Sequence, residues 1–159
     1  MTDEFLKAEA NHIRGLLGKR ESKAARASVE GALQSKFEGL QSLAAQVLAT
    51  WRSEKSKERL RSWLEEKLCQ QSSSLVGVAA QALRNRVEAG DAPWLLDLYF
   101  GAPGLLDRHH LLDVLDALPP GLLGDRIQSE LRSTDRSTRE AAEVLRNRLR
   151  FRTAQPAQK

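Results

Sequence analysis

Arg139-Glu-Ala-Ala-Glu-Val-Leu145 is the stretch that decides the fold, because three similar segments precede it in the chain. They are Ser42-Leu-Ala-Ala-Gln-Val-Leu48, Gly77-Val-Ala-Ala-Gln-Ala-Leu83 and His109-His-Leu-Leu-Asp-Val-Leu115. Their final leucines are 35, 32 and 30 residues apart. Self-similarity at this period predicts a stack of helical hairpins, since one hairpin is too thin to bury its apolar face alone.

The chain between these segments also favours helix. Leu and Ala carry the apolar content and aromatic residues make up only 5%, while no strand-like alternation occurs. Helical spacing, with breaks such as the Pro119-Pro120-Gly121 turn, predicts nine helices. They are expected over residues 3–17, 22–35, 37–51, 57–69, 75–88, 94–100, 105–118 and 122–131, and from a cap at 133–135 to about 151.

The four segments resemble the second helices of HEAT repeats, which typically read Val-Arg-x-x-Ala-x-x-Ala-Leu after an Asp-containing turn. Thr134-Asp135 before the fourth segment is the best local match, and Leu111-Leu112 in the third segment departs from the small-residue pattern. The resemblance covers roughly residues 24–151. It implies an all-α, right-handed α-solenoid of about four HEAT-like hairpins plus an N-terminal helix. We expect a single domain over 1–151 and a disordered tail over 152–159. A plain antiparallel helical bundle is the alternative.

In HEAT-like stacks the second helices line a concave, ligand-binding face. The resemblance therefore implies a set of outward positions, which are Gln46, Gln81, Arg84, His109, Asp113, Asp116, Arg139, Glu143, Arg146 and Arg150. Their charges change from neutral to acidic to basic along the chain. This mixture suits a protein ligand better than a nucleic-acid duplex, which needs a continuous basic track. The alternative is an ordinary solvated face.

The stretch Trp94-Leu-Leu-Asp-Leu-Tyr-Phe100 is apolar on nearly every side of a helix. Trp94, Tyr99 and Phe100 are therefore candidates for a contact with a partner. The other two tryptophans, Trp51 and Trp63, are expected in the core or at its rim.

The charge distribution leaves a nucleic-acid partner open. Net charge is +4, but residues 84–120 carry three arginines against six acidic residues, and residues 121–159 carry nine basic against five acidic residues. The arginines of the last helix could contact phosphates. We favour the alternative that they complement the helix dipole and pair with Glu140 and Glu143.

The sequence contains no recognisable catalytic motif. We therefore expect a protein without enzyme activity, without a cofactor and without a bound metal. The three histidines include an adjacent pair, His109 and His110, which point about 100° apart on a helix. HEAT-type hydroxylases carry repeated His-Glu pairs for iron, and this chain has none. Phosphate loops, CxxC pairs and nucleophile elbows do not occur either.

Cysteine usage and the N-terminus predict a cytoplasmic protein. Cys69 is the single cysteine, so no internal disulfide forms, and we expect it to be a small buried hydrophobic residue. Residues 1–5 do not begin a secretory signal, and no apolar stretch approaches the roughly 20 residues of a membrane helix. The sequence thus favours a non-enzymatic protein–protein interaction module, either an adaptor, an inhibitor or a subunit of a larger complex. The alternative is a nucleic-acid-binding or DNA-repair-type protein that uses the basic C-terminal half.

Overall fold

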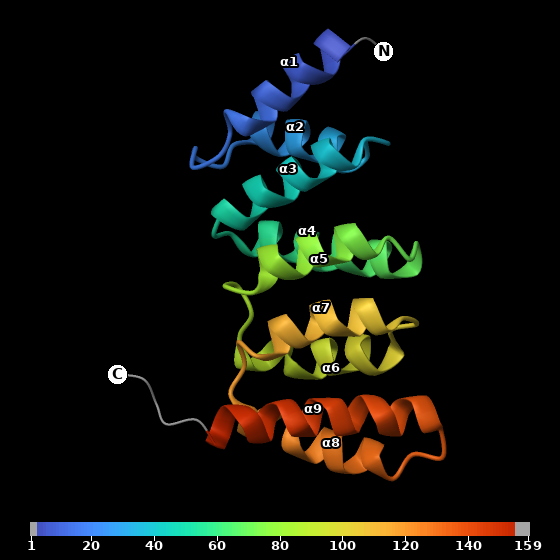
Figure 1. Ribbon diagram of the computed structural model, residues 1–159. Coiled ribbons are helices and arrows are strands. Elements are labelled where there is room, and N and C mark those ends of the chain that lie inside the picture. The colour runs from blue at the N-terminus through green and yellow to red at the C-terminus, as the bar shows by residue number, and fades with distance from the viewer. Residues whose placement is uncertain (1–2, 155–159) are drawn as a thin grey trace. The chain divides into compact units, whose positions relative to one another are not determined.

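The computed structural model describes residues 3–154, and all regular structure in that span is helical (Figure 1). Nine α-helices form there, with two short 3₁₀ turns and no strand, which confirms the all-α class. The helices are α1 (Asp3–Arg14), α2 (Lys23–Leu33), α3 (Glu38–Thr50), α4 (Glu54–Cys69), α5 (Ser73–Leu83), α6 (Ala92–Gly101), α7 (Leu105–Leu115), α8 (Gly124–Leu131) and α9 (Arg136–Ala154).

Side-chain caps define several helix starts. The hydroxyl of Ser53 accepts a hydrogen bond from the amide of Ser56 at 3.1 Å, so α4 begins three residues before its predicted start at 57. The predicted cap of the last helix is confirmed, because the Asp135 carboxylate accepts from the amide of Thr138 at 3.0 Å. Pro93 lies in the first turn of α6, where its missing N–H costs nothing.

Helix ends are less predictable than helix starts. α5 ends at Leu83 instead of 88, and the guanidinium of Arg86 in the following turn donates to the carbonyls of Trp51 and Ser53. At the other end of the chain, α9 continues to Ala154. Residues 152–154 are therefore helical where the sequence predicted the start of a tail, and residues 155–159 lie outside the described span.

The structure divides the chain into two compact units, residues 1–86 (unit 1) and 87–159 (unit 2), within the span predicted as one domain. In unit 1, α2 pairs with α3 and α4 pairs with α5. α3 also contacts α1 and α5, so these three helices form one layer, with α2 and α4 behind it (Figure 1). Trp63, Leu60 and Leu64 of α4 are fully buried in this unit.

Unit 2 contains two further helix pairs, α6 with α7 and α8 with α9. α9 also packs against α6. The core of this unit includes Leu95 and Tyr99 of α6, Leu111 of α7 and Ile127 of α8, all of them buried. The four helices of unit 2 share this non-polar interior, which lets α6, α7 and α8 be short.

The repeat leucines belong to the cores of their helix pairs. Leu48, Leu83, Leu115 and Leu145 are all buried, and each lies on the later helix of a pair. The small residues before them, Ala44, Ala79 and Ala141, are buried as well. The leucines that replace the small pair in the third segment are also part of the core.

Two predictions about single residues have opposite outcomes. Trp51 and Trp63 are buried, as expected. The prediction that Cys69 is a buried hydrophobic residue is wrong, because its side chain is exposed. Cys69 ends α4 on the face opposite Trp63 and Lys67, and a helix presents successive residues to different sides.

In the span that the structure describes, no helix is both long and apolar enough to cross a bilayer.

Candidate interaction groove between α7 and α9

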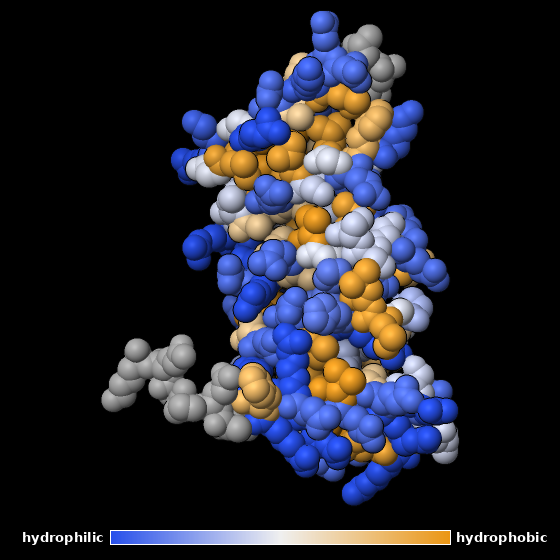
Figure 2. Space-filling model, in the orientation of Figure 1, coloured by the Kyte–Doolittle hydropathy of each residue, from blue (hydrophilic) through white to orange (hydrophobic). Residues whose placement is uncertain are grey.

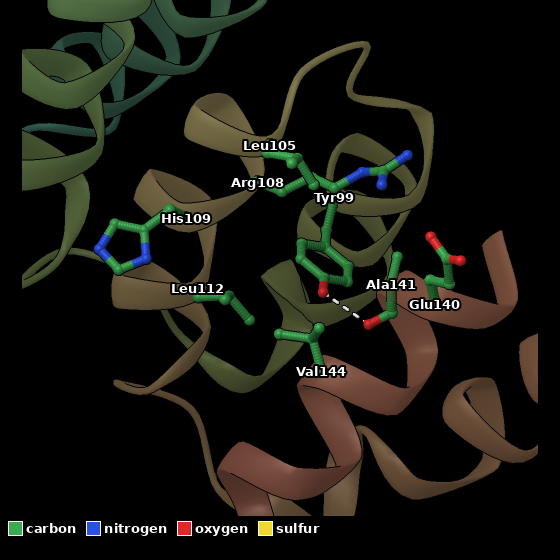
Figure 3. Close-up of a pocket in the computed structure, with 8 residues that line it drawn as sticks. All are labelled: Tyr99, Leu105, Arg108, His109, Leu112, Glu140, Ala141 and Val144. Atoms are coloured by element: carbon green, nitrogen blue, oxygen red, sulfur yellow. Dashed lines mark hydrogen bonds between the residues drawn. The ribbon is translucent and has the colours of Figure 1, made fainter. Parts of the chain in front are cut away.

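A pocket of about 220 Å³ opens between α7 and α9, with Tyr99 of α6 at its base (Figure 3). We call it the α7–α9 groove. α7 contributes four lining residues, which are Leu105, Arg108, His109 and Leu112. α9 contributes Glu140, Ala141 and Val144, and α6 contributes Tyr99. The groove therefore depends on two helices whose sequences are about 35 residues apart, and only their packing creates it.

Tyr99 is the fixed floor of the groove. Its side chain is 1% exposed, and its hydroxyl donates a hydrogen bond of 2.6 Å to the carbonyl of Ala141. Burial raises the pKa of the hydroxyl to about 12, because the charged tyrosinate would lose its hydration. The bond joins α6 to α9 and holds the ring beneath the apolar walls.

The rim of the groove is apolar and open to solvent. Leu105 is 82% exposed and Val144 is 51% exposed, and both contribute to the lining. Figure 3 shows Val144 and Leu112 beside the hydroxyl end of the tyrosine ring. Figure 2 shows apolar surface exposed over α7 and α9. Covering such side chains with a partner would remove apolar area from water, which is the main favourable term in association.

Charged groups flank the apolar part. Arg108 donates to the hydroxyl of Ser137 at 2.9 Å, which ties the start of α7 to the start of α9. His109 is exposed and points away from the tyrosine ring (Figure 3). Glu140 lies on the α9 wall, where it pairs with Arg136 one turn earlier at 2.9 Å. Positive and negative groups thus both border the opening.

An ion-pair network joins the same two helices further along. Arg148 of α9 contacts Asp113 of α7 at 2.9 Å and donates through Nε at 2.8 Å to Asp116, the residue that caps the end of α7. Hydrogen bonds from Arg148 to Asp116 raise the pKa of the guanidinium above its ordinary value, against the effect of burial. Asp113 and Asp116 were predicted as ligand-facing residues, but their carboxylates are instead engaged within unit 2.

The remaining predicted residues are distributed over both units. Gln46, Gln81 and Arg84 are exposed in unit 1, on α3 and at the end of α5. In unit 2, Glu143 and Arg150 are exposed, whereas the half-buried Arg139 donates to the carbonyl of Ser133 at 2.8 Å. Arg146 is half-buried, and its Nε has no hydrogen-bond partner among the described residues. Of all these positions, only His109 lines the α7–α9 groove.

The apolar contact candidates on α6 need a correction. Tyr99 is part of the core of unit 2 and forms only the floor of the α7–α9 groove, so it is not an exposed anchor for a partner. Phe100 is half-buried: its ring meets the ring of Tyr99 edge-on at 5.0 Å between centroids, and the guanidinium of Arg126 lies 5.2 Å from it. Trp94 is half-buried too. α6 is apolar on nearly every side because α7, α9 and the 3₁₀ turn before the helix all pack against it.

Sequence reasoning missed the two rim residues, Leu105 and Val144. A signal for Leu105 was present, since Leu105 and Leu106 are consecutive and point about 100° apart on a helix, so both cannot face one core. Val144 precedes the repeat leucine Leu145 and resembles a core residue by type. Its exposure follows from the orientation of α9, which the sequence does not encode locally.

Comparison with protein-family models, with curated proteins and with solved structures gives no match to this chain. Within residues 3–154, no group of three or more His, Cys, Asp or Glu side chains is arranged to hold a metal ion. The α7–α9 groove offers an apolar hollow, an exposed aliphatic rim and flanking charges of both signs.

Proposed function

We propose that this chain is a non-enzymatic protein–protein interaction module, an adaptor, an inhibitor or a subunit of a larger complex, that binds a protein partner in the cytoplasm. The α7–α9 groove is its contact site. The observation that carries the proposal is the exposure of Leu105 and Val144 over a preformed apolar pocket. Large aliphatic side chains that stay in water at the edge of a hollow gain free energy when a partner covers them.

The size of the groove favours a side chain of a partner over a small-molecule ligand. Its volume of about 220 Å³ is below the roughly 300–1,000 Å³ of pockets that enclose drug-sized molecules. One aliphatic or aromatic side chain is an appropriate occupant. Arg108 and Glu140 at the border then select the charges next to that side chain, since electrostatic complementarity contributes mainly to specificity.

The scaffold we propose is a right-handed, HEAT-like α-solenoid, in which the later helices of successive pairs form the binding face. Two observations support it. Helix pairs repeat along the chain, and the repeat leucines are all buried on the later helix of a pair, on α3, α5, α7 and α9. Both features are what a stack of hairpins requires.

Pairing of the arginines of α9 supports a protein partner over nucleic acid. Arg148 is held by Asp113 and Asp116, Arg136 is paired with Glu140, and Arg152 donates to the carbonyl of Leu118 at 3.3 Å. A guanidinium already engaged by a carboxylate would have to exchange that partner for a phosphate. Binding of a duplex needs a continuous track of free cations, and these three arginines of α9 do not provide one.

The test compares two single substitutions of the full chain. Leu105→Glu places a charge in the lining of the groove, and Leu106→Glu places the same charge on a neighbour that is 56% exposed and outside the lining. Both positions are in the first turn of α7, where a glutamate is compatible with the helix dipole. Circular dichroism should show that both variants keep their helix content.

Quantitative affinity capture from the source cell should recover the same protein partner with the wild-type chain and with Leu106→Glu, and lose it with Leu105→Glu. Direct binding of the purified partner then confirms the contact. Equal capture by both variants would refute the groove as the contact site. A salt-dependent shift of DNA or RNA by the wild-type chain, without any stable protein partner, would favour the nucleic-acid alternative.

A further inference from the structure

A second apolar groove lies in unit 1, between α1 and α3. Its volume is about 470 Å³, and we call it the α1–α3 groove. Its lining residues are Leu6, Lys7, Ala10 and Arg14 of α1, together with Phe37, Gly39, Leu40, Ser42, Leu43 and Gln46 at the start and along the first half of α3. Figure 2 shows apolar surface gathered over these two helices. No residue of the α7–α9 groove takes part, so the two surfaces are independent.

The groove is elongated. α1 and α3 run in the same direction and contact each other (Figure 1). The lining on α1 extends from Leu6 to Arg14, which at 1.5 Å per residue corresponds to roughly 12 Å along the axis. This length matches about two turns of a third helix. A groove of this kind accepts apolar side chains at positions i, i+4 and i+7 of an amphipathic helix.

The groove exists because α1 is incompletely covered. Ile13 is the one buried side chain described on this helix, and Leu6 and Ala10 are half-buried. Phe37 and Leu43 on the opposite wall are half-buried as well, whereas Leu40 forms a buried floor. The apolar groups are thus recessed between two helices instead of protruding, and a convex ridge fits this shape better than a flat lipid surface does.

The charged residues that line the groove all lie on α1. Lys7 and Arg14 line the groove from α1, and the lining contains no acidic residue. They are seven residues apart, which places them on one face of α1, two turns from each other. Both side chains are exposed, and neither forms an ion pair with another described residue; Arg14 donates only to the amide oxygen of Asn11, at 2.9 Å. Two cations that form no ion pair with another described residue thus border an apolar floor.

We propose that the α1–α3 groove binds an amphipathic helix of a partner protein whose apolar stripe is flanked, on the side that faces α1, by two acidic residues seven positions apart. The apolar stripe fills the recess over Leu40 and Leu43. The two carboxylates approach Lys7 and Arg14, and their spacing equals that of the cations because both helices have the same rise. The partner surface is distinct from the α7–α9 groove, so the proposal does not rest on the function proposed above.

The test uses a peptide library displayed against the immobilised full chain. Each member is an α-helix of about four turns with a fixed leucine stripe, and its flanking positions vary among Glu, Gln and Lys. Selection at low salt should enrich Glu over Lys by about tenfold at two positions seven apart, because two attractive exposed pairs replace two repulsive ones. Raising the salt concentration should reduce the enrichment.

Charge reversal provides the decisive variant. The double variant Lys7→Glu, Arg14→Glu changes two exposed side chains and leaves the core intact, so the fold should be retained. Selection against this variant should enrich Lys, instead of Glu, at the same two positions of the peptide. The matched control is Lys19→Glu combined with Lys23→Glu, two exposed cations of unit 1 outside the lining, and it should select the same acidic helices as the wild type. Leu43→Glu should abolish selection of either kind.

Three results would overturn the proposal. The first is a selected pool without charge preference, or no selected pool at all. The second is binding of phosphatidylserine vesicles by the wild-type chain that the Lys7 and Arg14 reversal removes, together with no selected peptide, which would assign the surface to anionic lipid. The third is a concentration-dependent dimer that Leu43→Glu dissociates, again without a selected peptide, which would assign the groove to a second copy of this chain.

Discussion

Tyr99 provides the sharpest test of how unit 2 is held together. It is the single tyrosine of the chain, so its ionisation can be followed by the ultraviolet absorbance of tyrosinate without interference from other tyrosines. Its hydroxyl is buried and donates to the Ala141 carbonyl, and burial raises its pKa from 10.0 to about 12. Replacing it by phenylalanine removes the hydrogen bond and the ionisation together, and keeps the ring.

The pH dependence follows from proton linkage. The unfolded chain releases the tyrosine proton near pH 10, whereas the folded chain retains it until about pH 12. The protonated hydroxyl of Tyr99 therefore makes its full contribution to the free energy of unfolding below pH 10. This contribution is lost as the pH rises from 10 to about 12. At 1.36 kcal/mol per pKa unit, the loss due to Tyr99 is about 2–3 kcal/mol. The hydrogen bond itself contributes about 0.5–1.5 kcal/mol at neutral pH.

The two effects have opposite signs for Tyr99→Phe, so the stability curves of the two proteins should cross. The variant should be less stable than the wild type by about 1 kcal/mol at neutral pH. It should become the more stable protein by about 1–2 kcal/mol near pH 12, since it has no proton to lose there. Urea titrations of both proteins across this pH range measure the difference, and effects common to both, such as lysine titration, cancel.

A direct titration completes the test. Rapid pH jumps of the folded wild-type protein should give a tyrosinate absorbance midpoint near 12, and the protein in concentrated urea should give one near 10. A folded midpoint near 10 would refute the burial of the hydroxyl. Parallel stability curves for the wild type and Tyr99→Phe would refute the linkage even if the midpoint were shifted.

Three further predictions concern other parts of the chain. The hydrogen bonds and charge of Arg59 hold the pKa of the Glu30 carboxyl below its ordinary value, so this carboxylate stabilises the fold at neutral pH and the gain is lost on acidification. Acid titration should therefore destabilise the wild type more than Glu30→Gln, and equal losses would contradict the pairing. Leu145→Ala should cost about 2–5 kcal/mol of unfolding free energy, against less than about 0.5 kcal/mol for Val144→Ala, its exposed neighbour. Cys69 of the native protein should react with a thiol reagent nearly as fast as the denatured chain, and strong protection would indicate that it is buried.

Local sequence signals were sufficient for the helices and for most of their boundaries. Apolar residues at helical spacing and breaks such as Pro119-Pro120-Gly121 placed nine helices in the correct order. These signals work because they depend on interactions between residues only three or four positions apart. The repeat segments also identified buried positions correctly, since Leu48 and Leu145 are core residues of their pairs.

Contacts between helices distant in sequence decided the rest. Asp116 was predicted to face a ligand, but it is engaged by Arg148, which is 32 residues away in the sequence. Tyr99 looked like a surface anchor, and its hydroxyl is bound to a carbonyl 42 residues away. Charge and residue type show that such groups need partners, yet they do not specify which helix brings the partner within reach.

The sequence by itself determined that this chain is helical, roughly where each helix lies, and which face of it is apolar, because these properties arise within a few turns of one helix. Only the tertiary structure decided which apolar side chains stay exposed. Leu105 and Val144 at the α7–α9 groove are exposed, and Leu6 and Leu43 at the α1–α3 groove are half-buried, although all four are of the same type as core leucines and valines. Their exposure depends on how closely neighbouring helices approach, and that distance is set by the packing of all the side chains between them.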